Sequence, residues 1–483
     1  MTERSPNNFN KAAKSALADP VLQGALARFE LGMNAKRTGA LKRMGEFDQL
    51  RDEARTIKDH VIENLDWYLE RFAQNVRLAG GHVHYCETAE DARNRVLAIC
   101  RDVNAKSVTK GKSMISEEIG LNSYLEENGI EPIETDLGEY IVQLAKEPPS
   151  HIIGPAIHKT RAQVGELFHE HHTAYGKTHV LSEGEDMVAE AREILRARFA
   201  NADVGITGAN FLIAETGSTI IVTNEGNGDL TQTLPKTHIV VASIEKIVPT
   251  LEDSVTLLRV LARSATGQDM SVYTTYSTGP KRADDMDGPE NFHVVLLDNG
   301  RSDLLGSEFA AILRCIRCGA CMNVCPVYAA VGGHTYGAVY MGPVGSVLSP
   351  ALLGVDEAHK LAGASTLCGR CEDVCPVRIP LPMLLRGWRT KAFERGKSGT
   401  IERMILKLWS FAALRPRLYH FLSACLLRIF RFFYRGRGHL HRAILLPGWT
   451  GTRDLPLPQA SQSFMAQWQN VEMGKSRHKG ASR

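Results

Sequence analysis

Long apolar runs are absent from this sequence of 483 residues. No segment reaches the roughly 18 uninterrupted apolar residues that cross a bilayer, and the best candidate, residues 418–427, is closed by Arg417 and Arg428. The first residues also lack the apolar core of a secretory signal, so we expect a cytoplasmic protein. Disulfides are rare in a reducing compartment. The ten cysteines therefore need another explanation.

Two other kinds of motif are missing. No GxGxxG occurs, so the sequence gives no case for a tightly bound flavin or nicotinamide. No nucleic-acid recognition motif accompanies the basic residues, and we predict no nucleic-acid partner.

Basic charge is concentrated at the C-terminal end. Residues 378–483 hold 20 Lys and Arg against 4 Asp and Glu, whereas the preceding 377 residues hold 37 against 50. Aromatic residues interleave with the arginines of this tail, and they are numerous enough to need burial. We therefore favour docking to another subunit or to the body of the chain, with an anionic membrane surface as the alternative.

Hydrophobic periodicity divides the chain into four segments. Residues 1–80 read as helical, and one apolar stripe there is expected to face a core: Leu65, Tyr68, Leu69, Phe72 and Val76. From 81 to 300, short β-rich runs alternate with helical ones. This alternation predicts an α/β domain with a mostly parallel, helix-flanked sheet. A hairpin is expected to turn at Thr216-Gly217-Ser218.

The other two segments follow. Residues 301–395 carry the cysteine runs, and residues 396–483 form a basic segment with helical periodicity over 401–434. Pro416 is expected to kink or divide that helix. From about residue 447 the composition predicts a loose tail.

Seven cysteines lie in two short runs. The first run has the pattern C-x2-C-x2-C-x3-C-P, formed by Cys315, Cys318, Cys321, Cys325 and Pro326. Thiolates are soft ligands suited to iron–sulfur clusters, and the spacing of three lets one turn direct three sulfurs at one cluster. In two-cluster ferredoxins the fourth cysteine of this run serves the other cluster.

The second run, C-x2-C-x3-C-P, is one cysteine short. By the crossing rule, the first cluster takes Cys315, Cys318, Cys321 and Cys375, and the second takes Cys325, Cys368 and Cys371. Aligned from its proline, the second run has Ser365 in the place of the missing thiol. Four alternatives stay open for the last ligand: Ser365, a water, a partner residue, or a vacant corner as in a three-iron (3Fe–4S) cluster.

Structural zinc is the competing interpretation of these cysteines. Zinc sites use two CxxC pairs that close one tetrahedron, whereas these runs each end in Cys-Pro, so we favour iron–sulfur clusters. Cys86, Cys100 and Cys425 stand apart from the runs, and we expect them to be buried packing residues.

At this point the chain resembles a known family. The cysteine runs follow an α/β segment that contains TKGKSMISEEIGL (109–121) and ETGSTIIVTNEGN (215–227). Together these features are similar to the bacterial lactate utilization protein B family, over roughly residues 60–400. The resemblance implies a Rossmann-like lactate-utilization domain, related to the sugar-isomerase and CoA-transferase-like fold, followed by an all-α ferredoxin-like module. It also implies two 4Fe–4S clusters on the seven cysteines.

The resemblance implies a role and partners as well. The role is electron transport during oxidation of L-lactate to pyruvate, as the carrier component of an L-lactate dehydrogenase complex. Companion lactate-utilization subunits are expected, among them a heterodisulfide-reductase-like protein with adjacent cysteines, because no CC dipeptide occurs here. A membrane-surface or quinone-linked acceptor is expected, which allows a peripheral position on the inner face of the membrane.

Two alternatives to the carrier role stay open. In the first, the protein is itself a catalytic 2-hydroxy-acid oxidoreductase that binds its substrate in the α/β domain. In the second, it is a scaffold for the complex. The sequence identifies no catalytic residue.

Two further groups of residues lie at expected strand ends. Lys110, Lys112 and Ser113 follow a strand, and we favour a solvated loop there, with anion binding as the alternative. Glu215 and Glu225 also occupy strand ends, where α/β sheets bind ligands. Ordinary turn chemistry explains these two glutamates, and we favour it.

Overall fold

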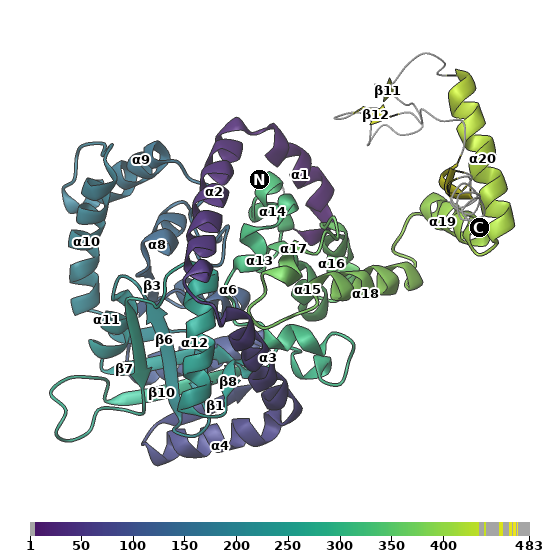
Figure 1. Ribbon diagram of the computed structural model, residues 1–483. Helices are drawn as coiled ribbons and strands as arrows, with labels where there is room; N and C mark the ends of the chain where they lie inside the picture. The colour runs from purple at the N-terminus through teal and green to yellow at the C-terminus, as the bar shows by residue number, and fades with distance from the viewer. Residues whose placement is uncertain are drawn as a thin grey trace. The chain divides into compact units, whose positions relative to one another are not determined.

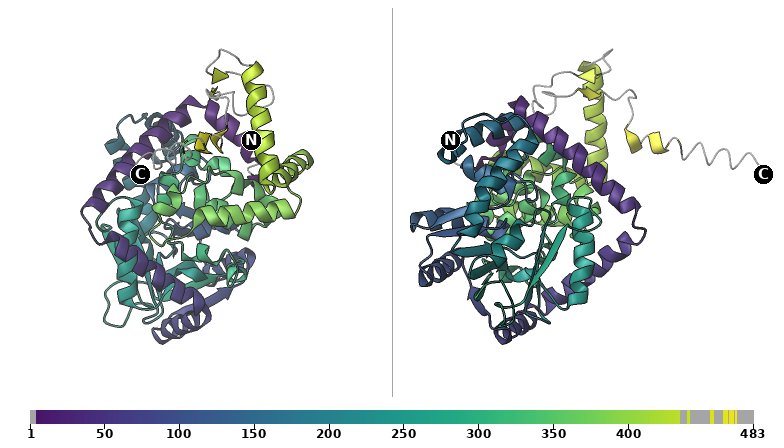
Figure 2. Two further views of the ribbon diagram at one scale, coloured as in Figure 1. Left: turned by 45° about the vertical axis from the view of Figure 1, so that its right-hand side comes forward. Right: turned by 90° about the vertical axis from the view of Figure 1, so that its left-hand side faces the viewer.

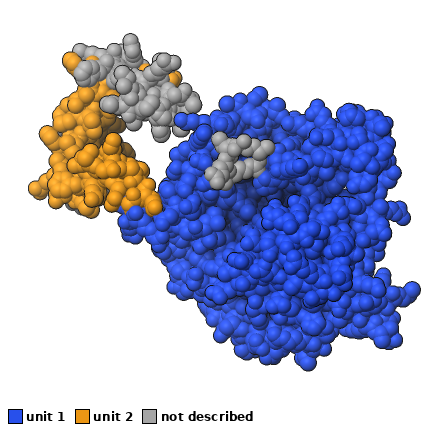
Figure 3. Space-filling model, turned by 180° about the vertical axis from the view of Figure 1, so that it is seen from behind, with its two compact units in different colours: residues 1–395 blue, residues 396–483 orange. Residues whose placement is uncertain are grey.

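The computed structural model describes residues 5–433, 439–440, 454–456, 463–465, 467–469 and 471. The chain divides into two compact units, residues 1–395 and 396–483 (Figure 3). The first unit contains all seven clustered cysteines. The finer division into four segments stays a prediction. No helix within the described ranges is both long and apolar enough to span a bilayer.

A parallel six-stranded sheet with the order β1-β10-β7-β4-β2-β3 lies at the centre of the first unit. Its strands are β1 (His82–Cys86), β2 (Ser107–Lys110), β3 (Glu131–Glu134), β4 (Val204–Thr207), β7 (Thr237–Ser243) and β10 (Asn291–Leu297). The predicted α/β fold with a mostly parallel sheet is confirmed. The sequence pattern missed β4, because the glycine within this strand weakens its β signal.

Helices cover both faces of this sheet (Figure 1). In the fully buried strand β7, Ile239 and Val241 pack on one side, and Val240 and Ala242 pack on the other. The first side carries α5 (Ala89–Asp102), α6 (Met114–Glu118) and α7 (Leu121–Glu127), and the second carries α3 (Phe47–Glu63) and α4 (Leu65–Leu78). Successive side chains of a strand point to opposite faces of the sheet. Because helices cover both faces here, the side chains on both faces are apolar.

The remaining helices of the α/β region extend this arrangement. They are α8 (Leu137–Leu144), α9 (Arg161–His172), α10 (Gly184–Ala200), α11 (Asn227–Thr233) and α12 (Leu251–Ala265). Residues of α8, α9 and α10 form a separate small core beside β3. The stripe predicted on α4 is buried at Leu65, Tyr68, Phe72 and Val76, and partly buried at Leu69.

A second sheet, which the sequence did not predict as a separate layer, has the order β8-β5-β6-β9. Its strands are β5 (Phe211–Ile213), β6 (Ser218–Thr223), β8 (Ile247–Val248) and β9 (Tyr273–Ser277). Strands β5 and β6 pair antiparallel, so the predicted hairpin is confirmed. Gly217 turns it with a φ of +70°, and a Cβ there would lie 2.5 Å from the backbone nitrogen of Val76, so only glycine fits.

The cysteine-rich segment is helical and packs beside the N-terminal helices (Figures 1 and 2). Its helices are α13 (Ala320–Asn323), α14 (Pro326–Val331), α15 (Gly342–Leu352), α16 (Val355–Ala358), α17 (Arg370–Asp373) and α18 (Leu381–Glu394). The N-terminal helices are α1 (Phe9–Ala18) and α2 (Pro20–Lys42). One continuous apolar core contains residues of both groups.

The second unit begins with α19 (Thr400–Ala413) and α20 (Pro416–Phe433), and it also contains the short strands β11 (His439–Leu440) and β12 (Leu455–Pro456). Pro416 is the first residue of α20, so it divides the helical segment as predicted. Cys425 is half-buried, whereas Cys86 and Cys100 are buried as expected. The predicted loose tail from residue 447 lies largely outside the described residues.

Candidate functional site

Four cysteines line one small, mostly apolar cavity: Cys315, Cys318, Cys321 and Cys375. Cys321 lies in α13, whereas Cys375 follows α17 in the second run. Cys318, Cys321 and Cys375 are each less than one-tenth exposed. The fold therefore brings three thiols of the first run together with the last thiol of the second.

Burial and the proximity of the four sulfurs shift the pKa values of thiols in this group. Burial, and after it the charge of the neighbouring Cys375, raise the pKa of Cys318 to about 12. The pKa of Cys321 is raised well above its usual value, by burial first and then by Cys318 and Cys315. Thiols with such a high pKa stay protonated near neutral pH, and they release the proton when a metal ion takes its place. A metal cluster fits this group better than free thiolates do.

The other three cysteines form a second and more exposed group. Burial raises the pKa of Cys371 to about 12, and Cys325 adds to the shift. Cys368 is exposed, and a hydrogen bond from the Thr366 hydroxyl is the largest cause that lowers its pKa. Because Cys371 also raises the pKa of Cys321, the two groups are electrostatic neighbours.

The two cysteine runs repeat one constrained turn. Arg317 and Gly319 of the first run have φ values of +58° and +73°, and Leu367 and Gly369 of the second run have +55° and +87°. Counted from the following cysteines, these positions match. A residue other than glycine that adopts a left-handed φ costs free energy. Because this costly conformation occurs at matching positions of both runs, the two runs have the same local fold.

Ser365 makes the same backbone contact in its run that Cys315 makes in the first. The N–H of Arg317 donates to Cys315 Sγ at 3.5 Å. The N–H of Leu367 donates to Ser365 Oγ at 3.1 Å. The serine hydroxyl therefore corresponds to the first thiol in sequence position, in backbone conformation and in its hydrogen-bond donor.

Buried cations surround Cys315. Lys58, Lys246 and Arg317 are each less than one-tenth exposed. Burial lowers the pKa of Lys58 and of Lys246 to about 8, and the charge on Cys315 opposes the shift in both. Glu245 pairs with Arg317 at 3.0 Å, but the cations outnumber this carboxylate. An anionic cluster held by thiolates would balance part of their charge, so these residues fit an iron–sulfur group.

A buried ion-pair network joins the α/β region to the cysteine-rich segment. Arg301 Nη2 lies 2.6 Å from Glu118 Oε2, and Arg301 Nε lies 3.0 Å from Glu245 Oε2. The hydroxyl of Tyr340 donates to Glu118 Oε2 at 2.6 Å. Removing one partner of such a buried pair costs about 3–5 kcal/mol. The network therefore fixes the cysteine-rich segment against the α/β region.

Side chains of α2 and α3 hold the cysteine loops by donating hydrogen bonds to backbone carbonyls of these loops. Arg51 of α3 donates to the carbonyl oxygen of Cys375 at 3.0 and 2.9 Å and to that of Asp373 at 2.7 Å. Asn34 of α2 donates to the carbonyl oxygen of Asn323 at 2.9 Å. Both cysteine runs are therefore anchored by side chains that come from the first sixty residues.

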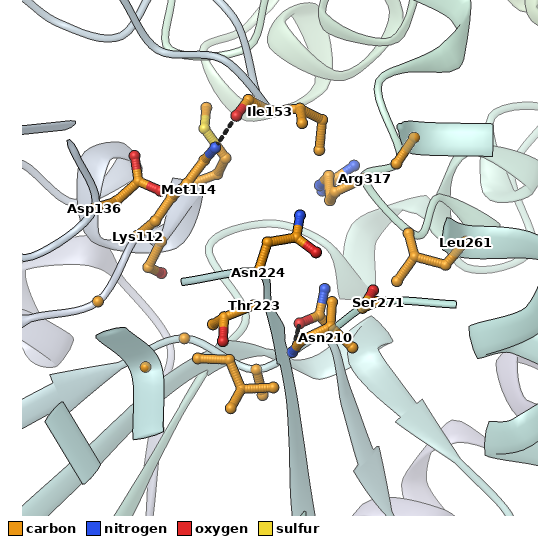
Figure 4. A pocket seen from close by; sticks show the side chains of 18 of the residues that line it. Lys112, Met114, Asp136, Ile153, Asn210, Thr223, Asn224, Leu261, Ser271 and Arg317 are labelled. Atoms are coloured by element: carbon orange, nitrogen blue, oxygen red, sulfur yellow. Dashed lines mark hydrogen bonds between the residues drawn. The ribbon is translucent and has the colours of Figure 1, made fainter. Parts of the chain in front are cut away.

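A larger cavity, of about 240 Å³, lies where strands of the parallel sheet end. Gly111, Lys112 and Ser113 follow β2, Gly208 to Asn210 follow β4, and Lys246 lies just after β7. These are neighbouring strands, and the carboxyl ends of parallel strands are the usual ligand position in α/β folds. Arg317 and Ile152 line both this cavity and the cysteine cavity. Figure 4 shows Arg317 at the larger of the two.

The prediction of a solvated loop after β2 is wrong. Lys110 is 1% exposed and pairs with Glu134 at 2.7 Å, and Ser113 is buried as the N-cap of α6. Of the three residues proposed there, Lys112 and Ser113 line the cavity and Lys110 does not. Glu215 accepts from the N–H of Leu251, the first residue of α12, at 3.1 Å, so it makes a long-range contact and not the turn contact favoured for it. Glu225 is exposed at the rim of the cavity and accepts from the N–H of the adjacent Asn224.

Several residues of the site gave no recognised signal in the sequence. Lys246 and Glu245 follow directly after a long buried strand, and charged residues at that position are a signal that would have found them. Arg317 lies inside the first cysteine run, where the sequence pattern indicated only the cysteines as site residues. Arg51 and Lys58 lie on a helix whose polar residues look like an ordinary solvent face.

This fold and these paired cysteine groups define an iron–sulfur protein with an appended α/β domain. The family described as LUD domain matches residues 69–297, and the family described as 4Fe-4S dicluster domain matches residues 311–379. Lactate utilization protein B of Bacillus licheniformis is 43% identical over 94% of this chain and 95% of its own length. Lactate utilization protein B of Geobacillus thermodenitrificans is 43% identical over 96% and 97%. The chain belongs to the lactate utilization protein B family.

Two other comparisons complete this result. The uncharacterized electron transport protein YkgF of Escherichia coli is 42% identical over 94% of both chains. The crystal structure of a DUF162 family protein from Deinococcus radiodurans covers 48% of this chain and 98% of that one, at 14% identity and a TM-score of 0.27.

Proposed function

We propose that this protein is an iron–sulfur electron carrier that serves the oxidation of L-lactate to pyruvate. The observation that supports this most is the pair of neighbouring cysteine groups within a 4Fe-4S dicluster domain. Relatives named for lactate utilization and for electron transport support the same role. When bound, a 4Fe–4S cluster accepts and releases one electron at a time.

The residues around the first group suit this role. Apolar walls exclude water, and backbone N–H groups donate to sulfur, as Ile379 does to Cys375 Sγ at 3.3 Å. Lys58, Lys246 and Arg317 place positive charge where an added electron is stabilised. The exposed Cys368 in the second group offers the place where electrons pass to or from a companion subunit.

The carrier role predicts that the isolated protein does not react with lactate. Anaerobically purified protein should contain about eight irons and eight sulfides per chain if both clusters are complete. L-lactate alone should leave its visible spectrum oxidised, whereas dithionite should bleach it, because in the carrier role lactate is oxidised on a companion subunit and only electrons reach this chain. Bleaching by L-lactate without companion proteins would instead make the protein the enzyme. A colourless protein that contains only zinc would refute both roles.

We propose further that Ser365 is the fourth ligand of the second cluster, beside Cys325, Cys368 and Cys371. Its correspondence to Cys315 supports this, because the first-run residue in that position is one of the four that line the first cavity. A hydroxyl is a harder ligand than a thiolate and holds its iron less tightly.

Replacing Ser365 separates the open alternatives for this corner. Ser365→Ala should lower the iron content from about eight to about seven per chain and give a three-iron signal in the oxidised protein. Ser365→Cys should keep all the iron and shift the midpoint potential, because a thiolate replaces an oxygen ligand. Iron analysis and electron paramagnetic resonance measure both effects.

Thr366→Val is the matched control, since it removes the adjacent hydroxyl that contacts Cys368. This variant should keep its full iron content. If Ser365→Ala retained the iron and spectrum of the unsubstituted protein, then a water or a partner residue would be the better candidate for the corner.

A further inference from the structure

We propose that the 240 Å³ cavity at the carboxyl ends of β2, β4 and β7 binds an organic carboxylate, whose charged group pairs with Lys246 and Arg317. The binding site stands on the geometry of the cavity alone, which the α/β region forms together with Arg317 of the first cysteine run. Its influence on the first cluster, through Arg317, rests on the proposed function.

Lys246 is the first reason to expect an anion. It lines the cavity and is 6% exposed, yet among the described residues its ammonium group has no hydrogen-bond or ion-pair partner. A buried charge without a partner is costly, and native proteins normally satisfy it with a counter-ion or a ligand. By contrast Lys58, which is also buried, donates to the backbone carbonyls of Glu245 and Ile247.

Arg317 is the second reason. Its Nη2 donates to Glu245 Oε1 at 3.0 Å, and its guanidinium lies 4.7 Å from the centre of the Tyr340 ring. Its Nε and Nη1 are buried and have no hydrogen-bond partner in the described part of the chain. The planar fork of an arginine matches a carboxylate in shape and charge.

The polar lining of the cavity supplies further donors and few free carboxylates. Asn210 and Asn224 each use the side-chain oxygen to accept backbone N–H groups, so their NH₂ groups are left to donate. Figure 4 shows the side chains of Asn224 and Arg317 on the same cavity. Two carboxylates also line it. Asp136 already accepts from the N–H groups of Gly138 and Glu139, and the exposed Glu225 accepts from the N–H of Asn224.

The apolar lining favours an organic anion over an inorganic one. Ile221, Val241, Leu261 and Ala265 form part of the wall. A volume of about 240 Å³ also exceeds what one small inorganic ion fills, since a single water needs only about 10–15 Å³ by the same measure. A carboxylate with an apolar body therefore satisfies both parts of the cavity.

The test uses the full-length protein, purified anaerobically with its clusters, and hexanoate as the probe. Calorimetry should detect saturable binding of hexanoate, and weaker or no binding of hexanol and inorganic phosphate, which lack the charge and the apolar body respectively. Affinity should rise from acetate towards hexanoate, by up to about fourfold for each methylene that meets apolar wall.

Two substitutions that remove the same charge near Cys315 make a matched pair. Lys246→Met should weaken hexanoate binding at least tenfold, whereas Lys58→Met, outside the cavity, should change it less than threefold. Ser271 lies on a loop at the cavity, and Ser271→Phe should block hexanoate binding by filling the cavity. This variant provides the test if Lys246→Met does not fold. Equal loss in both lysine variants, or no saturable binding by the unsubstituted protein, would overturn the proposal.

The cluster content of the protein distinguishes a failure of the carboxylate-binding proposal from a failure of the proposed electron-carrier function. Iron, sulfide and the reduced-state spectrum of the same samples report the clusters whether or not the cavity binds a ligand. Where the cluster is present, hexanoate should lower the midpoint potential of the nearer cluster, because a bound anion disfavours an added electron. By linkage, reduction should weaken hexanoate binding by the same factor.

Discussion

Replacing Cys318 by alanine is expected to remove one of the two clusters and to abolish growth on lactate. The thiol lies in the buried four-cysteine cavity, and no other cysteine lines that cavity besides its three partners among the described residues. Iron should fall from about eight to about four per chain, because a four-iron cluster that loses a buried ligand has no solvent to replace it. Metal analysis, electron paramagnetic resonance and growth of a strain carrying only this variant measure the result.

Cys100→Ala is the control for this prediction. Cys100 is fully buried on α5, and burial raises its pKa to about 12, but it lies in the α/β core away from the cysteine runs. This variant should keep its iron and support growth, with only a modest loss of stability. Unimpaired growth of the Cys318→Ala strain would contradict the electron-carrier role.

Two substitutions within the second run are expected to remove different clusters. Cys375→Ala should lose the same resonance signal as Cys318→Ala, because Cys375 lines the cavity of the first group. Cys371→Ala should leave that signal and lose the other, because the cysteine whose charge most raises the pKa of Cys371 is Cys325 of the second group. Each variant should retain about four irons, and spectra of the reduced proteins would tell the two apart.

This prediction depends on thiols crossing between the runs. If each run instead held its own cluster, then Cys371→Ala and Cys375→Ala would lose one identical signal, and Cys318→Ala would lose the other. The double variant Cys318→Ala/Cys375→Ala adds a further check. It should resemble either single variant when the two thiols bind one cluster, and it should lose all iron otherwise.

The sequence predicted the α/β fold because strands and helices have different periods, and those periods survive in any environment. It also predicted the hairpin at Gly217, since a turn is a local structure. It failed at β4 and at the loop after β2. The glycine in β4 weakens its β signal, and the burial of Lys110 depends on Glu134, which is distant in the chain and adjacent only in the sheet.

For the site, the sequence by itself determined which seven cysteines belong together, because ligand spacing within a tight turn is a local property. It also located Ser365 at the missing position. The sequence had no means to show that Lys58, Lys246 and Arg317 surround Cys315, or that Arg51 holds the second run. Those neighbours come from three separate stretches of the chain, and only tertiary packing brings their charges within reach of one another in a medium too dry to screen them.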